Sequence, residues 1–178
     1  MMSTITKFCL LATVLLISCS KANKHYSFES IDYSSFLGYY FNSIKILSDG
    51  TIYVKYDYKE AFDNKHDSIK YYTYMLDKSQ IDTLSNLVEK VYEIKVEPRY
   101  DLEMDSGLTF SLIINSKLGK LSTSYNGPWS FDSLKPLIDL VTYLTKISNK
   151  VRTSVDSEFV FESGSKLVMP FPPPQVIK

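Results

Sequence analysis

Cysteine, arginine and histidine are all scarce in this 178-residue chain. The two cysteines, Cys9 and Cys19, lie near the N-terminus, so no disulfide is expected to stabilise the remainder, which must depend on an apolar core. Arg99 and Arg152 are the only arginines, which disfavours bidentate clamps for carboxylate or phosphate groups. Lys+Arg and Asp+Glu number 20 each. Without a basic excess to neutralise phosphates, we expect no nucleic-acid partner.

The sequence also lacks the short motifs that accompany common catalytic and cofactor chemistry. No G-x-S-x-G elbow, H-E-x-x-H pair, P-loop or dinucleotide fingerprint occurs. The only histidine beyond residue 35 is His66, in a polar stretch at 59–67 where a solvated loop is expected. We therefore expect neither a cofactor nor an enzymatic activity.

The chain has the composition of a globular protein, and its N-terminal residues have the pattern of a leader. Hydrophobic residues make up 44% and charged residues 22% of the sequence, enough for one domain with a core. Lys7 is followed by a largely apolar run, Phe8 to Ile17. This run is too short for a membrane span, which needs about 20 residues, but it is typical of a secretory signal peptide.

The run ends at Leu16-Ile17-Ser18-Cys19, which resembles the lipobox of bacterial lipoproteins. The resemblance implies that residues 1–18 are a signal peptide, that the Cys19 thiol carries diacylglycerol, and that its new amine is acylated, for example with palmitate. Ser20, in place of an aspartate, suggests the outer membrane, and the lack of acidic residues after it suggests the periplasmic face. The alternatives are a plain secretory signal with an incidental cysteine, or a short N-terminal anchor helix.

The mature chain begins with a polar segment and continues with strand patterns. Residues 19–35 are interpreted as a tether, because their scattered aromatic residues show no period. Ser48-Asp49-Gly50 predicts a tight hairpin turn, since glycine accepts a positive φ. Alternating apolar residues predict strands at 39–47, 51–57, 68–76, 107–115 and 120–125.

Two helices are expected between and after these strands. Asp77 and Gln80 have the spacing of a capping box, and an apolar stripe from Ile81 to Tyr92 follows. A second helix should begin near Asp132 or Ser133, because Pro136 is tolerated only in a first turn.

The resulting order, βββ-α-ββ-α, predicts an α+β fold over residues 36–150. We expect two layers, with a mainly antiparallel sheet and both helices on one face. The other face should present polar and tyrosine side chains: Tyr53, Lys55, Thr109, Ser111, Ser122 and Ser124. Residues 151–178 form a C-terminal extension in which 159–161 and 167–169 could pair as a hairpin. Its Pro-rich tail should be extended.

The run from Ile44 to Tyr53, with its S-D-G-T turn, resembles the opening of a small domain of unknown function found in bacterial lipoproteins. In that domain a strand, this turn and a second strand precede a helix and a later hairpin, and residues 39–147 match that layout. The resemblance implies no established activity.

Three acidic residues are weak candidates for a metal site. Asp101, Glu103 and Asp105 are two apart, so their side chains point the same way on an extended segment and could converge on a hard cation. A solvated strand edge explains the same pattern and is preferred.

Exposed tyrosines are candidates for a ligand face, because aromatic rings stack on sugars and pack in protein interfaces. The residues considered are Tyr53, Tyr72 and Tyr74. The simpler alternative is that they pack at the margin of the core with their hydroxyl groups in water.

Three functions follow as hypotheses. The first is a lipid-anchored, non-enzymatic envelope protein that binds another envelope protein or a glycan. The second is an inhibitor or immunity-type periplasmic lipoprotein that acts through a loop such as 58–67. The third is a hydrolase that uses carboxylates alone, such as Asp101 and Glu103.

Overall fold

The computed structural model describes residues 27–37, 40–58, 68–102, 108–128, 132–150, 153–155 and 158–166. The predicted leader at 1–18, Cys19, the predicted loop at 59–67 and the Pro-rich stretch near the C-terminus lie outside the described residues. What the sequence predicts for these segments stays a prediction.

The described residues form one sheet of eight strands and two α-helices. The strand order is β5-β7-β6-β1-β2-β3-β4-β8, and among the described strands only β5 and β7 pair in parallel. The α+β fold with a mainly antiparallel sheet is therefore confirmed. The strands are β1 (Ser30–Leu37), β2 (Tyr40–Leu47), β3 (Thr51–Tyr58), β4 (Ser68–Met75), β5 (Arg99–Asp101), β6 (Leu108–Ser116), β7 (Gly119–Gly127) and β8 (Thr153–Val155).

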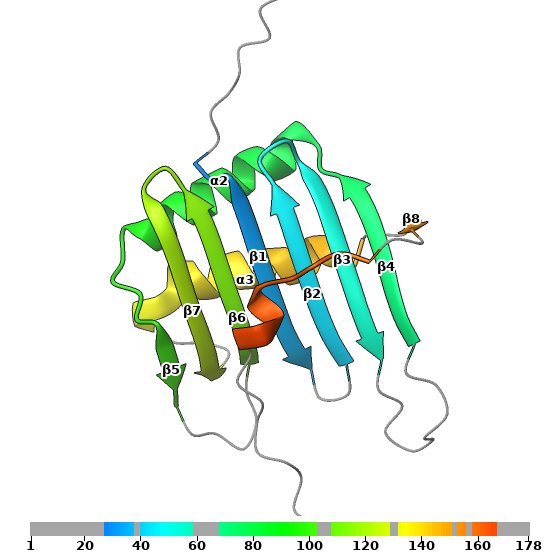
Figure 1. Ribbon diagram of the computed structural model, residues 1–178. Helices are drawn as coiled ribbons and strands as arrows, with labels where there is room; N and C mark the ends of the chain where they lie inside the picture. The colour runs from blue at the N-terminus through cyan, green and yellow to red at the C-terminus, as the bar shows by residue number, and fades with distance from the viewer. Residues whose placement is uncertain are drawn as a thin grey trace, which may run out of the picture.

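Both helices lie on the same side of the sheet. They are α2 (Lys78–Tyr92) and α3 (Lys135–Ser148), and the 3₁₀ turn η1 (Asp132–Leu134) precedes α3. Figure 1 shows α2 and α3 behind the sheet, while the C-terminal residues cross in front of it. We call the helix-covered side the back face and the opposite side the front face.

Local sequence signals account for the hairpin and the helix ends. Gly50 has φ +92°, and the Thr51 backbone N–H donates to Asp49 Oδ1 at 2.8 Å, so the predicted turn is present. At α2, the Gln80 N–H donates to Asp77 Oδ1 and the Asp77 N–H donates to Gln80 Oε1, both at 2.9 Å. This is the expected capping box. Pro136 sits in the first turn of α3, as predicted.

The core fills the space between the back face and the helices. Alternate residues of the long strands point into it, and each helix buries one apolar stripe. The Tyr33 hydroxyl, paired with Thr145 Oγ1 at 3.2 Å, has its pKa raised because burial disfavours the charged phenolate. Fully buried members include Phe28, Ile31, Tyr33, Ile44, Ile46, Ile52, Val54, Leu84, Val88, Phe110, Leu112, Ile114, Leu137, Leu140 and Leu144.

The prediction of a tether over residues 19–35 is wrong from Ser30 onward. β1 begins there and lies in the middle of the sheet, between β2 and β6. Ile31 and Tyr33 belong to the core, and Phe28 just before the strand does too. Ile31 and Tyr33 alternate with polar residues, as is common in an antiparallel sheet, but this short alternation was not recognised among the scattered aromatic residues of the segment.

The element order is accordingly ββββ-α-βββ-α-β rather than βββ-α-ββ-α. The short strands β5 and β8 were also missed, because three residues carry no readable alternation. The C-terminal hairpin is wrong as well. Residues 158–161 form no strand, and the next residues form the 3₁₀ turn η2 (Ser163–Lys166). Residues 167–169 lie outside the described residues.

Candidate binding face

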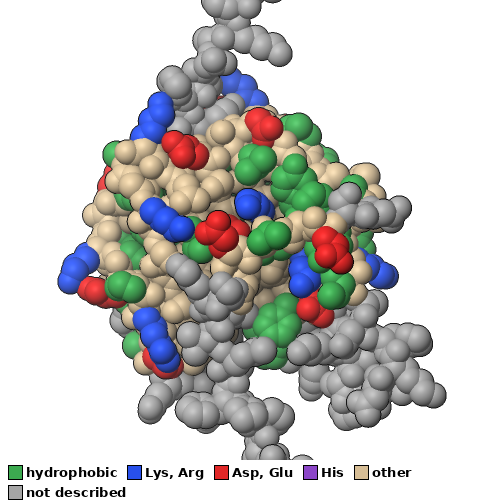
Figure 2. Space-filling model, in the orientation of Figure 1, with side chains coloured by type: hydrophobic (Ala, Val, Ile, Leu, Met, Phe, Trp, Pro, Cys, Tyr) green, Lys and Arg blue, Asp and Glu red, His purple; other side chains and the backbone are tan. Residues whose placement is uncertain are grey.

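The front face is polar, as the alternation predicted. The six residues expected there occupy positions that alternate with core residues such as Ile52, Val54, Phe110 and Leu112. Figure 2 shows acidic and basic side chains interspersed over the coloured part of this face, with hydrophobic side chains gathered toward β3 and β4. This face therefore combines a polar centre with an apolar side.

Four serines cross the middle of the front face in one row. The strand register pairs Ser43 with Ser34, Ser34 with Ser111, and Ser111 with Ser124. We call these four residues the serine row. Such small side chains let another segment approach the sheet closely, and all four are buried. η2 packs on β1 and β6 at this position.

The segment that covers the serine row is the C-terminal stretch 158–166, which we call the strap. Figure 1 shows it running across the front from the β4 side toward β1 and β6. In sequence it is about 130 residues away from β1, and the contact between the two is polar. The strap occupies the front face as a bound peptide would.

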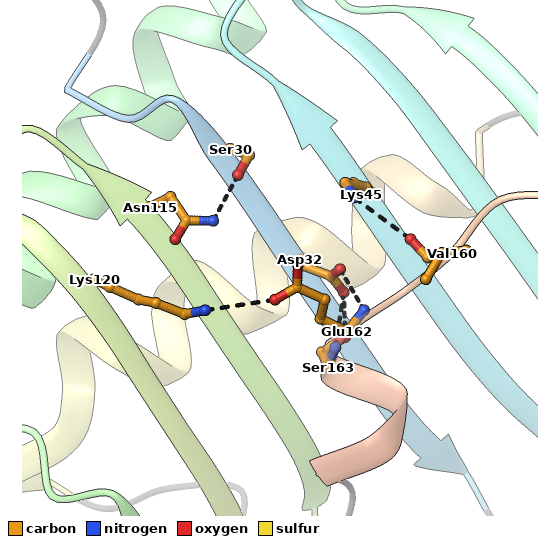
Figure 3. Close-up of polar contacts among 8 residues, drawn as sticks. All are labelled: Ser30, Asp32, Lys45, Asn115, Lys120, Val160, Glu162 and Ser163. Atoms are coloured by element: carbon orange, nitrogen blue, oxygen red, sulfur yellow. Dashed lines mark hydrogen bonds and ion pairs between the residues drawn. The ribbon is translucent and has the colours of Figure 1, made fainter.

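Asp32 holds the strap at the centre of the sheet, as Figure 3 shows. The Glu162 backbone N–H donates to Asp32 Oδ2 at 2.8 Å, and the Ser163 N–H donates to Oδ1 at 3.3 Å. The Ser163 hydroxyl adds a short hydrogen bond to Oδ1. The Asp32 carboxylate is only 3% exposed. Its buried charge is thus satisfied by three donors from the strap, as a buried carboxylate requires.

A chain of hydroxyl groups extends this contact across the serine row. Ser163 Oγ lies 2.8 Å from Ser34 Oγ, which lies 2.7 Å from Ser43 Oγ. Ser111 Oγ, in contrast, is fully buried and has no hydrogen-bond partner among the described residues. A buried hydroxyl without a partner costs free energy, of order 1–3 kcal/mol. The strap therefore leaves one polar position of the face unsatisfied.

An aromatic contact holds the other end of the strap. The Phe159 ring lies 4.2 Å from the Tyr53 ring and 6.0 Å from the Tyr71 ring, measured between centroids. The pKa of Tyr71 is raised, first by burial and then by the negative charges of Glu158 and Asp57. This end of the face is an aromatic subsite formed by two adjacent strands, β3 and β4.

Two lysines flank the strap on the outside. Lys45 Nζ donates to the Val160 carbonyl oxygen at 3.5 Å, and Lys120 Nζ lies 3.5 Å from Glu162 Oε2. Both contacts are long and exposed, so each contributes little to stability. The strap is therefore held mainly by Asp32, the serine row and the aromatic subsite.

The three tyrosines predicted as a ligand face do not share one face. Tyr53 is on the front, but β4 pairs Tyr72 with Val54 and Tyr74 with Ile52, which places both on the back. Tyr72 packs edge-on against Tyr56 at the core margin, and Tyr74 is 44% exposed. The grouping failed because residues on different strands were combined without their register. Tyr71 is the residue that accompanies Tyr53.

The structure describes only one of the three candidate metal ligands. Asp101 lies in β5, while Glu103 and Asp105 lie outside the described residues. The pKa of Asp101 is lowered because Arg99, at 2.9 Å, and the Asn126 amide donate hydrogen bonds to its carboxylate. Within the described ranges, no three acidic, cysteine or histidine residues are grouped as metal ligands would be.

Sequence reasoning missed Asp32, Ser34 and Ser163, which form the centre of this face. The available signal was the alternation of Ile31 and Tyr33 with Asp32 and Ser34, which has the period of a strand. No local pattern pointed to Ser163, because its role depends on a partner far away in the sequence.

Two comparisons with known proteins add no relative. No protein-family model matches the chain, and no curated protein matches it. Among the helices of the described residues, none has both the length and the apolar character needed to span a bilayer.

Proposed function

We propose that this protein is a lipid-anchored envelope protein whose α+β domain binds a partner, without catalysis, through its front face. The observation that supports this most strongly is the state of Asp32. Its carboxylate lies in the middle of a polar sheet face and receives every described hydrogen bond from a separate stretch of polypeptide. A sheet face built in this way accepts backbone N–H and hydroxyl groups as ligands.

The aromatic subsite supports the proposal that the front face binds a partner and does not serve only to stabilise the fold. Tyr53 and Tyr71 present adjacent rings on neighbouring strands, and Phe159 packs against both. Tyrosine is enriched in binding surfaces because its ring supplies contact area at small cost in conformational entropy. A partner would therefore meet an apolar anchor position beside a charged hydrogen-bond acceptor.

The lipid anchor at Cys19 would give this binding its location. The apolar run and the lipobox-like Leu16-Ile17-Ser18-Cys19 support acylation of the thiol and then of the new amine. A single acyl chain binds membranes only marginally, whereas two or more hold stably. Tethering also raises the local concentration of the domain toward envelope partners. We propose the periplasmic side of the outer membrane as its location.

Replacing Cys19 with alanine should abolish acylation and release the protein from membranes, because no other thiol follows the leader. Labelled fatty acid and membrane fractionation measure both effects. The matched control is Cys9→Ala, which removes a thiol inside the leader and should leave the label and the fractionation unchanged. Incorporation of label into Cys19→Ala would contradict the proposed anchor.

The proposed binding face can be located on the anchored protein in its own membranes. A photo-crosslinking residue at Lys120, exposed at the front of β7, should give a discrete and saturable adduct. The same residue at Thr142, exposed on α3 at the back, should not. The adducts are compared on denaturing gels. Equal crosslinking from both positions, or none from Lys120, would contradict partner binding at the front.

A further inference from the structure

We infer that the front face is a peptide-binding site that the strap closes in cis. Its ligand is a segment of another envelope protein that carries an aromatic residue and, four positions later, a serine at which the backbone turns. This inference rests on the proposed function and names its ligand class. The strap supplies the pattern, because Phe159 and Ser163 are the side chains through which it meets the aromatic subsite and Asp32.

Asp32 determines the hydrogen-bonding half of this specificity. Its two carboxylate oxygens accept from two successive backbone N–H groups and from one hydroxyl. Only a backbone that turns at this point directs two consecutive N–H groups at one carboxylate, and only serine or threonine adds the hydroxyl. A ligand must therefore turn over β1 and carry a hydroxyl residue there.

The residue after the serine lies beside the serine row. A Cβ atom added at Gly164 would lie 3.6 Å from Ser34 Oγ, which is ordinary contact distance, and Gly164 is exposed. Glycine is therefore not required at this position of the ligand. At the other end, the rings of Tyr53 and Tyr71 receive an aromatic side chain. The distance between the two subsites fixes the spacing in the ligand.

The strap is suited to act as a replaceable occupant. The surface that it covers is composed of a carboxylate, hydroxyls and tyrosine rings, and these groups regain hydrogen bonds to water when the strap leaves. The apolar core lies on the other face of the sheet and stays covered by α2 and α3. Opening the front face therefore does not require unfolding.

The unsatisfied hydroxyl of Ser111 favours replacement by another segment. It is buried beneath the strap without a hydrogen-bond partner among the described residues. A competing segment that brings a polar group to this position would satisfy it and gain affinity over the strap. The strap, in turn, has the advantage of being tethered, which gives it an effective concentration in the millimolar range. An external ligand can bind only those molecules in which the strap has left the front face. Its apparent affinity is therefore its intrinsic affinity multiplied by the fraction of molecules in this open state.

The test uses the purified full chain and a fluorescent synthetic peptide of residues 158–166 as the probe. A double variant, Phe159→Ala with Ser163→Ala, weakens the strap without altering the face. We expect it to bind the probe at least tenfold more tightly than the natural chain, as measured by fluorescence anisotropy. A control peptide with alanine at the positions equivalent to Phe159 and Ser163 should bind at least tenfold more weakly.

Two further substitutions, each added to the double variant, assign the binding to this face. Asp32→Asn should weaken probe binding at least tenfold, and Tyr53→Ala at least fivefold. Tyr53 is partly exposed, so its replacement keeps the test valid if Asp32→Asn perturbs folding.

Equal affinity of the natural chain and the double variant would overturn the inference, and so would absence of probe binding to the double variant. Either result leaves the proposed function standing if Lys120 still crosslinks selectively in membranes. Probe binding without that crosslink would refute the proposed function and retain the peptide site.

Discussion

Replacing Ile31 with alanine is expected to lower the free energy of unfolding by about 2–5 kcal/mol. The Ile31 side chain is fully buried in the core from the central strand β1. Truncation removes apolar contacts on both sides and leaves a cavity that neighbouring strands, fixed by their hydrogen bonds, cannot close. Urea unfolding followed by circular dichroism measures the change.

The control for this substitution is Ile69→Ala in β4, where the isoleucine is 48% exposed. Because that side chain is half in water, its loss should change stability by less than about 0.5 kcal/mol. A similarly small effect at Ile31 would show that β1 does not contribute to the core and would restore the interpretation of residues 19–35 as a tether.

Replacing Asp32 with alanine should release the strap and cost about 2–3 kcal/mol, since hydrogen bonds to a charged group contribute about 1.5–3 kcal/mol. The strap donors at Glu162 and Ser163 lose their acceptor, so they can be satisfied only by moving into water. Hydrogen exchange of these two amides should become fast, while exchange in β1, β2 and β6 should stay slow.

Asp57→Asn is the matched control, because Asp57 also lies on the front face and pairs with Lys55 at 3.7 Å. This weak ion pair should be worth less than about 0.5 kcal/mol, and the amides of the strap should keep their protection. Retention of that protection in Asp32→Ala would mean that other contacts hold the strap, and the cis-closure inference would lose its basis.

Together, the two substitutions separate the two functions of a single strand. Ile31 and Asp32 are consecutive, so their side chains point to opposite faces of the sheet. Ile31→Ala should weaken the whole fold and leave the strap in place. Asp32→Ala should free the strap and leave the core packed. Such a division requires β1 to be central, with the helices on one side and the strap on the other.

The candidate site was harder to predict than the fold. Tyr53 was correctly placed on the front by its alternation with Ile52 and Val54, because period 2 is a local property of a strand. Tyr72 and Tyr74 were grouped with it incorrectly, because register between strands depends on pairing and not on the spacing of residues in the sequence.

Local signals in the sequence determined the α+β composition, the turn at Gly50, the capping of α2 by Asp77 and the start of α3 near Pro136. In each case the residues that interact lie within a few positions of one another. Only the tertiary structure decided that β1 is a central strand and that Asp32 is buried. The polar residues of β1 would be equally favourable in water, but a segment 130 residues away in the sequence covers them. Burial of a polar face depends on the partner that packs on it, and no local pattern in a sequence specifies that partner.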